Sequence, residues 1–299
     1  TLIIPTRNRP YFLLKLLKNL KNLKIKFKEI IIIDSSNKEI KIKINNIIKN
    51  FKCKIYHSKP STSFQRNIGL KNKDKKSKYV MFLDDDIIFK KNSFFSLNNR
   101  IIFHEKNKSK ILGYGFNQKK KTKKSLLENI KKSKIAKIFR LYSKKDGIVM
   151  SSGWQTKILN ISDDTLTEWI PTGAVVFPSN VLNIKFNENF GKYSYLEDLD
   201  FSLNLRKKNY MNKFLIVANA VFFHPNDIER INFNFGLIEI LNRFLIERKY
   251  KLNIFYFFYM SFVKSLMTLL MSLKNIKNMM KFFGNIIGIL LCLKKLIFY

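Results

Sequence analysis

Three consecutive carboxylates, Asp84-Asp85-Asp86, follow the apolar run Tyr79–Leu83 and are the side chains best suited to chemistry in this chain. The run has the length and the Val, Phe and Tyr content of a buried strand. Because burying unpaired charge is costly, the acids should emerge at the carboxyl end of that strand, where open α/β sheets place their ligands. A hard divalent cation such as Mn²⁺ or Mg²⁺ relieves the repulsion between adjacent carboxylates. A solvated turn is the alternative.

A second group of acids, Glu197, Asp198 and Asp200, opens a predicted helix much later in the chain. A carboxylate at that position can act as a general base. The helix dipole also favours acids at a helix N-terminus, so a structural role stays open for them. His224 follows a strand-like run and offers either an imidazole ligand or a structural hydrogen bond.

The segments that must position these acids alternate between strand and helix. Three apolar runs predict strands and two segments with apolar residues at helical spacing predict helices, in the order 2–5, 13–23, 29–34, 40–51 and 53–57. The unbroken isoleucine run of the second strand suits a parallel strand covered on both faces. This alternation predicts a doubly wound α/β unit, whose right-handed crossovers bring the strand ends to one rim.

Further polar groups are expected on the same rim. Thr6 and Arg7 end the first strand, and Asp34 ends the second. A predicted short helix carries Arg66 near its start, where its backbone N–H groups and the guanidinium would face an anion. A solvated surface helix is the alternative for this segment. Gly173 precedes another apolar strand and would permit close approach to a ligand or to a second strand.

Composition narrows the class of protein. The 299 residues are 46% hydrophobic, which excludes a disordered chain. A net charge of +36 would suit nucleic acid or an anionic membrane. The over-use of Lys, Ile, Asn and Phe also fits a bias towards A/T-rich codons, so the charge alone does not identify a partner. Cys53 and Cys292 are the two cysteines and suggest neither a disulfide framework nor a cysteine metal site. No secretory signal is recognised, and a reducing cytoplasm fits.

Two regions depart from this pattern. Residues from about 106 to 146 contain the run Lys119-Lys120-Lys121-Thr122-Lys123-Lys124 and are expected to form a basic insertion with a helix near 126–142. Residues 251–299 are apolar and basic, and no Asp or Glu follows Glu247. We expect this tail to form helices that lie in the membrane interface. A helical cap packed on the preceding domain is the alternative.

Seven short motifs together resemble one family, the inverting family 2 glycosyltransferases of the GT-A fold. They follow in the family's order: Ile3-Ile4-Pro5-Thr6-Arg7-Asn8-Arg9, Ile31-Ile32-Ile33-Asp34-Ser35-Ser36, Gln65-Arg66-Asn67-Ile68-Gly69, Phe82-Leu83-Asp84-Asp85-Asp86, Pro171-Thr172-Gly173-Ala174, Leu196-Glu197-Asp198-Leu199-Asp200-Phe201 and Phe222-Phe223-His224. The resemblance covers residues 1 to about 250 apart from the basic insertion. It implies a Rossmann-like mixed sheet flanked by helices, followed by C-terminal membrane-associated helices over 251–299.

The resemblance also implies a role for each matched residue. A nucleotide-sugar donor would be held by Thr6, Arg7, Asp34, Arg66 and Asp84. A divalent metal, Mn²⁺ or Mg²⁺, would be held by Asp84, Asp86 and His224. The catalytic base would be Asp198, with Gly173 and Glu197 beside the acceptor.

The implied reaction moves one sugar from a nucleotide sugar to a hydroxyl of a glycan or a lipid-linked acceptor, as a hexosyltransferase does. The segment after Asp198 reads Leu203-Asn204-Leu205-Arg206 and lacks the Gln-x-x-Arg-Trp pattern of processive synthases, so single-sugar transfer is expected. The apolar and basic tail leads us to expect the protein at the inner face of the cytoplasmic membrane, and nucleic acid is not expected as a partner. A nucleotidyltransferase, or a basic nucleic-acid-binding protein, is the alternative function.

Overall fold

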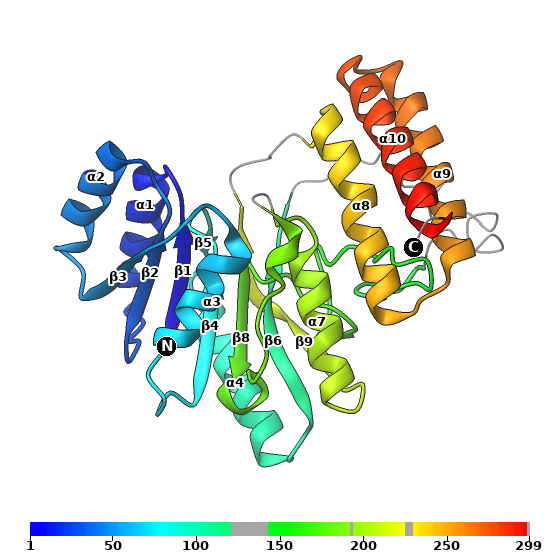
Figure 1. Cartoon of the computed structure of the whole chain (residues 1–299). Helices are drawn as coiled ribbons and strands as arrows, with labels where there is room; N and C mark the ends of the chain where they lie inside the picture. Colours follow the sequence, from blue (N-terminus) through cyan, green and yellow to red (C-terminus); the bar gives the residue numbers. More distant parts are fainter. Residues whose placement is uncertain (121–142, 192–193, 225–229, 298–299) are drawn as a thin grey trace. The chain divides into compact units, whose positions relative to one another are not determined.

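The computed structural model describes the chain except for residues 121–142, 192–193, 225–229 and 298–299 (Figure 1). The chain divides into two compact units. The sheet unit contains residues 1–123 and 157–226, and the helical unit contains residues 124–156 and 227–299.

The first half of the sheet unit is the doubly wound arrangement that the sequence predicts. Its strands β3, β2, β1 and β4 are neighbours in that order and run parallel. The elements are β1 (Leu2–Thr6), α1 (Pro10–Asn22), β2 (Ile30–Asp34), α2 (Lys38–Ile48), β3 (Cys53–His57), α3 (Thr62–Asn72) and β4 (Tyr79–Leu83). The carboxyl ends of β1, β2 and β4 therefore lie along one edge, where Thr6, Asp34 and Asp84 follow.

The second half turns the sheet into a mixed one. β8 (Ala174–Pro178) runs antiparallel to β4, and the order continues through β6 and β9 to β5. Within the described residues the sheet has nine strands, with β7 paired to β9. The remaining elements of this half are β5 (Ile88–Phe89), α4 (Ser93–Lys106), β6 (Ile111–Gln118), β7 (Thr165–Thr167), α7 (Glu197–Lys208), β9 (Lys213–Phe223) and the short 3₁₀ turns Ser179–Val181 and Glu188–Phe190.

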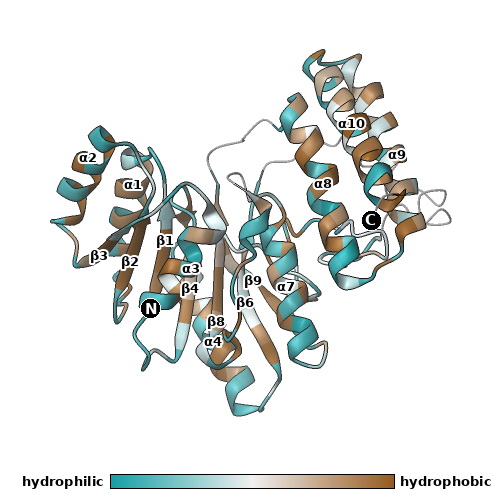
Figure 2. Ribbon diagram, viewed as in Figure 1, coloured by the Kyte–Doolittle hydropathy of each residue, from teal (hydrophilic) through white to brown (hydrophobic). Residues whose placement is uncertain are grey.

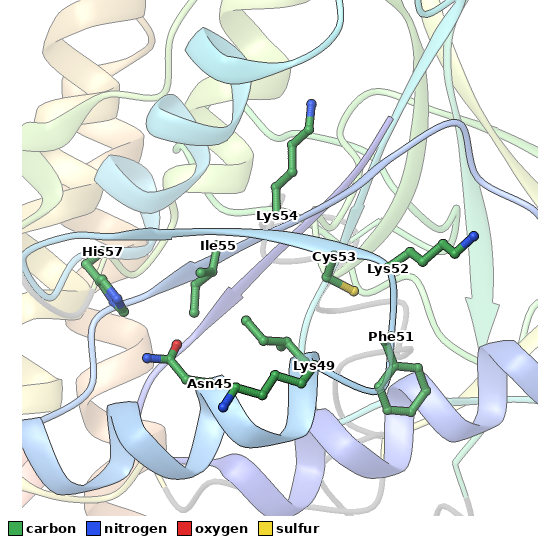
Figure 3. Close-up of a pocket in the computed structure, with 9 residues that line it drawn as sticks. Asn45, Lys49, Phe51, Lys52, Cys53, Lys54, Ile55 and His57 are labelled. Carbon is green, nitrogen blue, oxygen red and sulfur yellow. The ribbon is translucent and has the colours of Figure 1, made fainter.

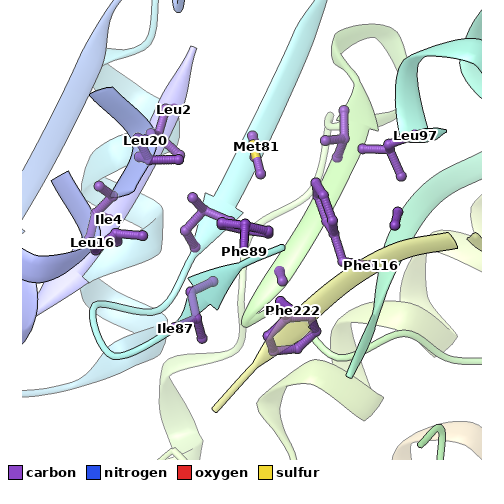
Figure 4. Packing of buried hydrophobic residues seen from close by; sticks show 14 of the residues in the cluster. Leu2, Ile4, Leu16, Leu20, Met81, Ile87, Phe89, Leu97, Phe116 and Phe222 are labelled. Carbon is purple, nitrogen blue, oxygen red and sulfur yellow. The ribbon is translucent and has the colours of Figure 1, made fainter. Parts of the chain in front are cut away.

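Apolar side chains on one face of the sheet form a continuous cluster with those of the helices α1, α2 and α4 (Figure 4). The leucines at helical spacing in α1 are all buried, as their period requires. Ile31, Ile32 and Ile33 are fully buried, so both faces of β2 are covered, as an unbroken apolar run predicts. This packing fixes the strand ends that carry the polar residues of the edge.

Part of the expected basic insertion belongs to the sheet. Residues Ile111–Gln118 form β6, which lies between β8 and β9, so the start expected near residue 106 is corrected. Glycines at 113 and 115 break the apolar pattern because they lie against Phe177 and Ile216. The helix expected over 126–142 lies outside the described residues. The strand-like run expected before His224 is β9, which extends over Lys213–Phe223.

The helical unit consists of α8 (Phe233–Tyr250), α9 (Ile254–Ser272) and α10 (Lys277–Ile297), together with the segment that ends at Thr156. Arg243 of α8 donates hydrogen bonds of 2.8 Å to the carbonyl oxygen of Gly153 and to Gln155 Oε1, and its guanidinium lies over the Trp154 ring. The tail boundary expected at residue 250 lies inside this unit, because α8 packs closely on α10. Figure 2 shows hydrophobic residues along α9 and α10.

Candidate active site

The Asp triplet lies at the end of β4, but two of its three carboxylates are buried. Asp85 and Asp86 are 4% and 3% exposed, at the carboxyl end of the strand where the acids were expected. Burial is tolerated because both are paired. Thr6 Oγ1 donates to Asp85 Oδ2 at 2.6 Å, and Arg9 Nη1 donates to Asp86 Oδ2 at 2.6 Å and to Asp85 Oδ1 at 3.3 Å. The cluster is therefore a hydrogen-bonded network in which Arg9 supplies positive charge.

His224 completes this network from a different strand. β9 ends at Phe223, which pairs with Ile88 of β5, two residues after Asp86. This pairing brings His224 Nε2 to 3.0 Å from Asp86 Oδ1. Burial opposes ionisation of Asp86, but the hydrogen bonds from His224 and Arg9 outweigh it and lower the pKa of this carboxyl below its usual value. Asp86 is therefore held as a carboxylate.

Arg66 connects the Asp triplet to the second acid cluster. It is 2% exposed on α3, whose N-cap Ser61 accepts a hydrogen bond from the Phe64 N–H. Arg66 Nη2 donates to Asp84 Oδ1 at 2.9 Å, and Nη1 pairs with Glu197 Oε1. Burial raises the pKa of Glu197 to about 7, while the contact with Arg66 acts in the opposite direction. Two acids far apart in sequence are thus joined through one guanidinium.

Gly173 lies directly against Asp84. The carbonyl oxygen of Gly173 accepts a hydrogen bond of 2.8 Å from the Asp84 N–H, where β8 pairs with β4. A Cβ atom added at position 173 would lie 2.5 Å from Asp84 Oδ2. The glycine is therefore required for the Asp84 carboxylate to keep its position, a more specific reason than the close approach that the sequence indicated.

Asp198 occupies the first turn of α7, beside Glu197. Its side chain is half-buried, and Oδ1 accepts a hydrogen bond of 2.8 Å from the Leu199 N–H. Asp198 also interacts electrostatically with Arg66. The N-cap residue Leu196 has a φ of +71°, a left-handed conformation that turns the chain sharply into the helix. This turn sets both acids at the same edge of the sheet unit as Asp84.

The residues expected around a nucleotide differ in their exposure to solvent and in their hydrogen-bond partners. Arg7 is exposed just beyond β1, and Thr6 is buried and bonded to Asp85. Asp34 is fully buried, and its Oδ1 accepts a hydrogen bond of 2.9 Å from the Ser36 N–H. Its Oδ2 lies 3.5 Å from His57 Nδ1 and accepts no hydrogen bond from the described residues. That oxygen is an unused acceptor at the strand ends.

Asp86 and His224 are suited to a divalent cation. Asp86 Oδ1 and His224 Nε2 lie 3.0 Å apart, about the separation of adjacent ligands around an octahedral cation whose bonds are about 2.0–2.1 Å long. Across the described residues, no group of three or more His, Cys, Asp or Glu side chains could hold a metal by itself. Mg²⁺ is commonly bound by one or two protein side chains, with water and substrate phosphate oxygens completing its shell. The pair therefore fits such an ion.

Two residues of this network were not among those predicted from the sequence. Arg9 neutralises Asp85 and Asp86, and Asp85 joins Thr6 to Arg9. The second arginine of Thr6-Arg7-Asn8-Arg9 was the available signal, since a basic residue one turn beyond a strand can reach the neighbouring strand end. Arg66 was expected to contact the nucleotide, but both of its terminal nitrogens face carboxylates.

A shallow groove of about 660 Å³ lies elsewhere, along β3 and the end of α2 (Figure 3). It is lined mainly by basic and apolar side chains, including Lys49, Lys52 and Lys54. None of the acids of the two clusters lines it, and His57 is its one lining residue that contacts Asp34. The acid clusters, and not this groove, therefore form the candidate site.

The fold and the acid clusters define a sugar-transferring class of protein, and comparison with known proteins gives the family. Residues 1–159 match the family described as Glycosyl transferase family 2. The chain belongs to that family, and its mixed sheet flanked by helices is the GT-A fold. The match includes Asp84 and Asp86 and ends before Asp198 and His224. No curated protein matches the chain.

Solved structures with a similar fold include S. aureus TarS. The TarS 1–349 crystal structure is 17% identical, with a TM-score of 0.46 over 82% of this chain and 64% of that one. Its complex with UDP-GlcNAc gives 16% identity and a TM-score of 0.45, over 82% and 66%. The longer TarS structure gives 16% and 0.45, over 81% and 39%. The chain thus spans less than two thirds of the length of these proteins.

Proposed function

We propose that the protein is an inverting glycosyltransferase that moves one sugar from a nucleotide sugar to an acceptor hydroxyl with the assistance of a divalent metal. Membership of family 2 supports sugar transfer as the reaction. The observation that carries the finer proposal is the contact of Arg66 with both Asp84 and Glu197. This contact brings the two acid clusters to one place, so that one can serve the leaving group and the other the attacking hydroxyl.

The donor nucleotide is proposed to bind along the ends of β1 and β2. Asp34 Oδ2 has no hydrogen-bond donor but is closed to solvent, so side chains around it would have to move before it could accept a hydrogen bond from a base or a ribose. Exposed Arg7 can neutralise a phosphate. Thr6 supports this position indirectly through its bond to Asp85. Asp84, whose side chain is 38% exposed, is the acid of the triplet best able to reach the ribose.

Asp86 and His224 would hold Mn²⁺ or Mg²⁺, with the exposed face of Asp84 close by. A bound divalent cation neutralises the charge that develops on the diphosphate as the sugar leaves. Arg9 keeps Asp86 ionised and in place through its 2.6 Å contact with Oδ2. The other oxygen of Asp86 faces His224 Nε2 in this structure, and both atoms would be available to hold the ion once the imidazole has no proton on Nε2.

Asp198 is proposed as the general base. It would accept the proton of the acceptor hydroxyl as that oxygen forms its bond to the anomeric carbon and the bond to the diphosphate breaks. A single displacement from the opposite face inverts the anomeric centre. The pairing of Arg66 with Glu197 fixes the first turn of α7, so that Asp198 is presented in one position. Gly173 and Glu197 would border the acceptor.

The acceptor is proposed to be a glycan or a lipid-linked glycan, handled at the inner face of the cytoplasmic membrane. The helical unit, with its basic and apolar helices, supports this location. Transfer of one sugar per event follows from Leu203-Asn204-Leu205-Arg206 standing where a processive synthase has its own motif. Hexose or hexosamine donors are the first to examine.

A donor screen tests the function directly. The full-length protein is incubated with UDP-, dTDP- or GDP-sugars and either Mn²⁺, Mg²⁺ or EDTA, and release of nucleoside diphosphate is measured. Metal-dependent hydrolysis of one donor, absent in the Asp198→Asn variant and unchanged in the exposed control Asp163→Asn, would support the proposal. Release of pyrophosphate from a nucleoside triphosphate, with every nucleotide sugar left intact, would instead indicate a nucleotidyltransferase.

A further inference from the structure

Helix α9 is built with its polar residues inside. Its buried face carries four small hydroxyl side chains, Ser261, Ser265, Thr268 and Ser272, beside the apolar Phe257 and Met260. The Ser261 and Ser265 hydroxyls each donate 2.8 Å hydrogen bonds to the carbonyl oxygens one turn earlier, so they need no water. A helix of a water-soluble domain shows the opposite distribution, as α1 does with its buried leucines.

The outward face of α9 is apolar. Phe255, Phe262 and Leu270 are 72%, 54% and 64% exposed, although each is large and hydrophobic. Scattered exposed apolar residues are ordinary, but a continuous face of them marks contact with an apolar partner. Because hydroxyl side chains share the buried face while large apolar ones cover the outward face, the surroundings of this helix should be at least as apolar as its own interior.

Helix α10 repeats the pattern. Gly284, Gly288 and Cys292, spaced four residues apart, are buried on the side where α10 packs on its neighbours. A Cβ atom at 284 would overlap the Phe233 carbonyl oxygen of α8, and one at 288 would lie 2.9 Å from Ile240 Cβ. The two backbones are therefore in close contact, the mode of packing that small residues permit inside membranes.

Large apolar side chains again cover the outward face of α10. The exposed set on this helix is Met280, Phe283, Ile287, Leu290, Leu291, Leu293 and Ile297. Together with the outward residues of α9 they form the apolar surface of the hairpin, which we define by these side chains and by Phe255, Phe262, Leu266, Leu270 and Met271.

The lysines of the two helices are arranged as a membrane requires. Lys281 Nζ is 2.8 Å from Glu239 Oε2 of α8, and Lys264 also interacts with Glu239. Charged residues inside membranes are turned inward and paired in this way. Other lysines lie at the helix ends, at 274, 277, 294 and 295, where they can contact anionic headgroups.

The length of α9 agrees with the thickness of a bilayer. Its 19 residues extend over about 28 Å at about 1.5 Å per residue, and the hydrocarbon layer is about 30 Å thick. Among the described helices, α9 alone is long and apolar enough to cross a membrane by length and composition, which by itself is weak support. The burial of hydroxyl side chains and the exposure of large apolar ones on α9 are a second observation, which does not depend on the length or composition of the helix.

We propose that α9 and α10 form a helical hairpin inserted in the hydrocarbon layer of an anionic membrane. The small and hydroxyl-bearing faces then contact other helices, and the apolar surface of the hairpin contacts acyl chains. This goes beyond the interfacial position that the sequence suggests for residues 251–299. The insertion would attach the protein to the membrane, and it does not depend on the proposed reaction.

The experiment measures lipid contact at single positions. Cysteine is introduced at Leu270, Leu290 or Phe95 in a Cys53→Ser, Cys292→Ala background, and each variant is labelled with an environment-sensitive nitrobenzoxadiazole dye. The full-length protein is placed in phosphatidylcholine vesicles containing phosphatidylglycerol. We expect blue-shifted emission at 270 and 290 that lipids with brominated acyl chains quench. Phe95 is equally exposed, lies on α4 of the sheet unit, and should show neither effect.

A charge substitution and extraction complete the test. Phe262→Lys places a charge on the outward face at mid-helix and should lower the ratio of vesicle-bound to free protein on the order of a hundredfold. The matched control Phe95→Lys should leave the ratio unchanged. The wild type should remain in the pellet after high salt and after alkaline carbonate.

Three outcomes would overturn the proposal. Release by salt or carbonate without acyl-chain quenching would show binding at the headgroups only. A monodisperse monomer that does not bind vesicles would show that α9 and α10 form a soluble helical cap. A detergent-free dimer in which the dyes at 270 and 290 are shielded without lipid would show that a second copy covers the surface. None of these measurements depends on nucleotide-sugar turnover. A negative result for membrane insertion can therefore be told apart from a negative result for the proposed function.

Discussion

The guanidinium of Arg66 pairs with the carboxylate of Glu197, although 131 residues separate them in the sequence. Both side chains are buried, and the same guanidinium bonds Asp84. Breaking a buried pair by removing one partner leaves an uncompensated charge, which costs about 3–5 kcal/mol. Replacing both partners by neutral groups of similar size costs much less.

From this we expect Arg66→Met to lower the free energy of unfolding by about 3–5 kcal/mol at pH 8. The double variant Arg66→Met/Glu197→Gln should recover part of the loss but none of the transfer activity. Since burial raises the pKa of Glu197, removing Arg66 raises it further, and the single variant should regain stability as pH falls and Glu197 takes up a proton. Denaturant titrations at pH 6 and pH 8 measure this, and a double variant no more stable than Arg66→Met would contradict it.

Asp198→Asn should abolish transfer while leaving donor binding nearly intact. The amide keeps the shape of the side chain but cannot accept the hydroxyl proton, so kcat should fall roughly 10²- to 10⁴-fold. Steady-state kinetics and calorimetric titration of the donor measure the two effects, with Asp163→Asn as the exposed control. A loss of donor affinity as large as the loss of rate would argue against a base at this position.

His224→Ala should raise the concentration of Mn²⁺ or Mg²⁺ required for half-maximal donor binding by about tenfold or more, because one of the two close ligands is lost. Asp86→Ala should abolish the metal dependence of binding. His104, on α4 and away from the acid clusters, provides the matched His→Ala control. Isothermal titration with and without EDTA is the measurement, and identical metal requirements for the two histidine variants would refute the assignment.

Gly173→Ala should reduce activity by displacing the Asp84 carboxylate, since the new methyl group would meet Asp84 Oδ2 at 2.5 Å. A flexible carboxylate can rotate away, so the melting temperature should change little. If position 173 acts only through Asp84, then Gly173→Ala/Asp84→Ala should be no less active than Asp84→Ala. A further loss in the double variant would show that Gly173 has a separate role at the acceptor.

The stability of the sheet unit should depend on pH in the acidic range through the ionisation of Glu29. Partial burial would raise its pKa, but hydrogen bonds from Lys54, Thr1 and the Asp74 N–H outweigh this and lower it below 4.5. A lowered carboxyl pKa contributes stability above 4.5 that is lost as pH falls through the folded value. Glu29→Gln should cost about 1 kcal/mol at pH 7 and less at pH 3. Unfolding curves that differ equally at both pH values would disprove it.

The parallel half of the sheet could be predicted because its signals are local. The run Ile30–Ile33 and the leucines of α1 are sufficient to identify a covered strand and the helix that packs on the sheet. β6 could not be predicted in the same way. Its two glycines face bulky partners, and its buried Asn117 bonds the N–H and the carbonyl oxygen of Ile161. Each of these choices depends on a residue far away in the sequence.

The candidate site likewise contains residues with a local sequence signal and residues whose contacts depend on distant parts of the chain. The acids at 84, 86 and 198 could be singled out because each follows a recognisable strand or opens a recognisable helix, and their roles stay predictions. The carboxylates that contact the arginines could not be predicted, because a guanidinium reaches several ångströms from its own backbone and its partners lie on other elements. Arg9 was not singled out, and the pairing of Arg66 with Glu197 was not foreseen.

The strand order also bears on self-association. A sheet that ends in open strands exposes unpaired N–H and carbonyl groups, to which strands of other molecules can add. At one end, exposed Lys52 lies directly before β3 and exposed Lys54, which pairs with Glu29, lies within it, so positive charge at this edge repels a like-charged copy. At the other end, β5 and β7 both pair with β9 and have only two and three residues, so each offers too short a template. One edge of the sheet is thus protected against fibril-like stacking by positive charge, and the other edge by the short length of its strands.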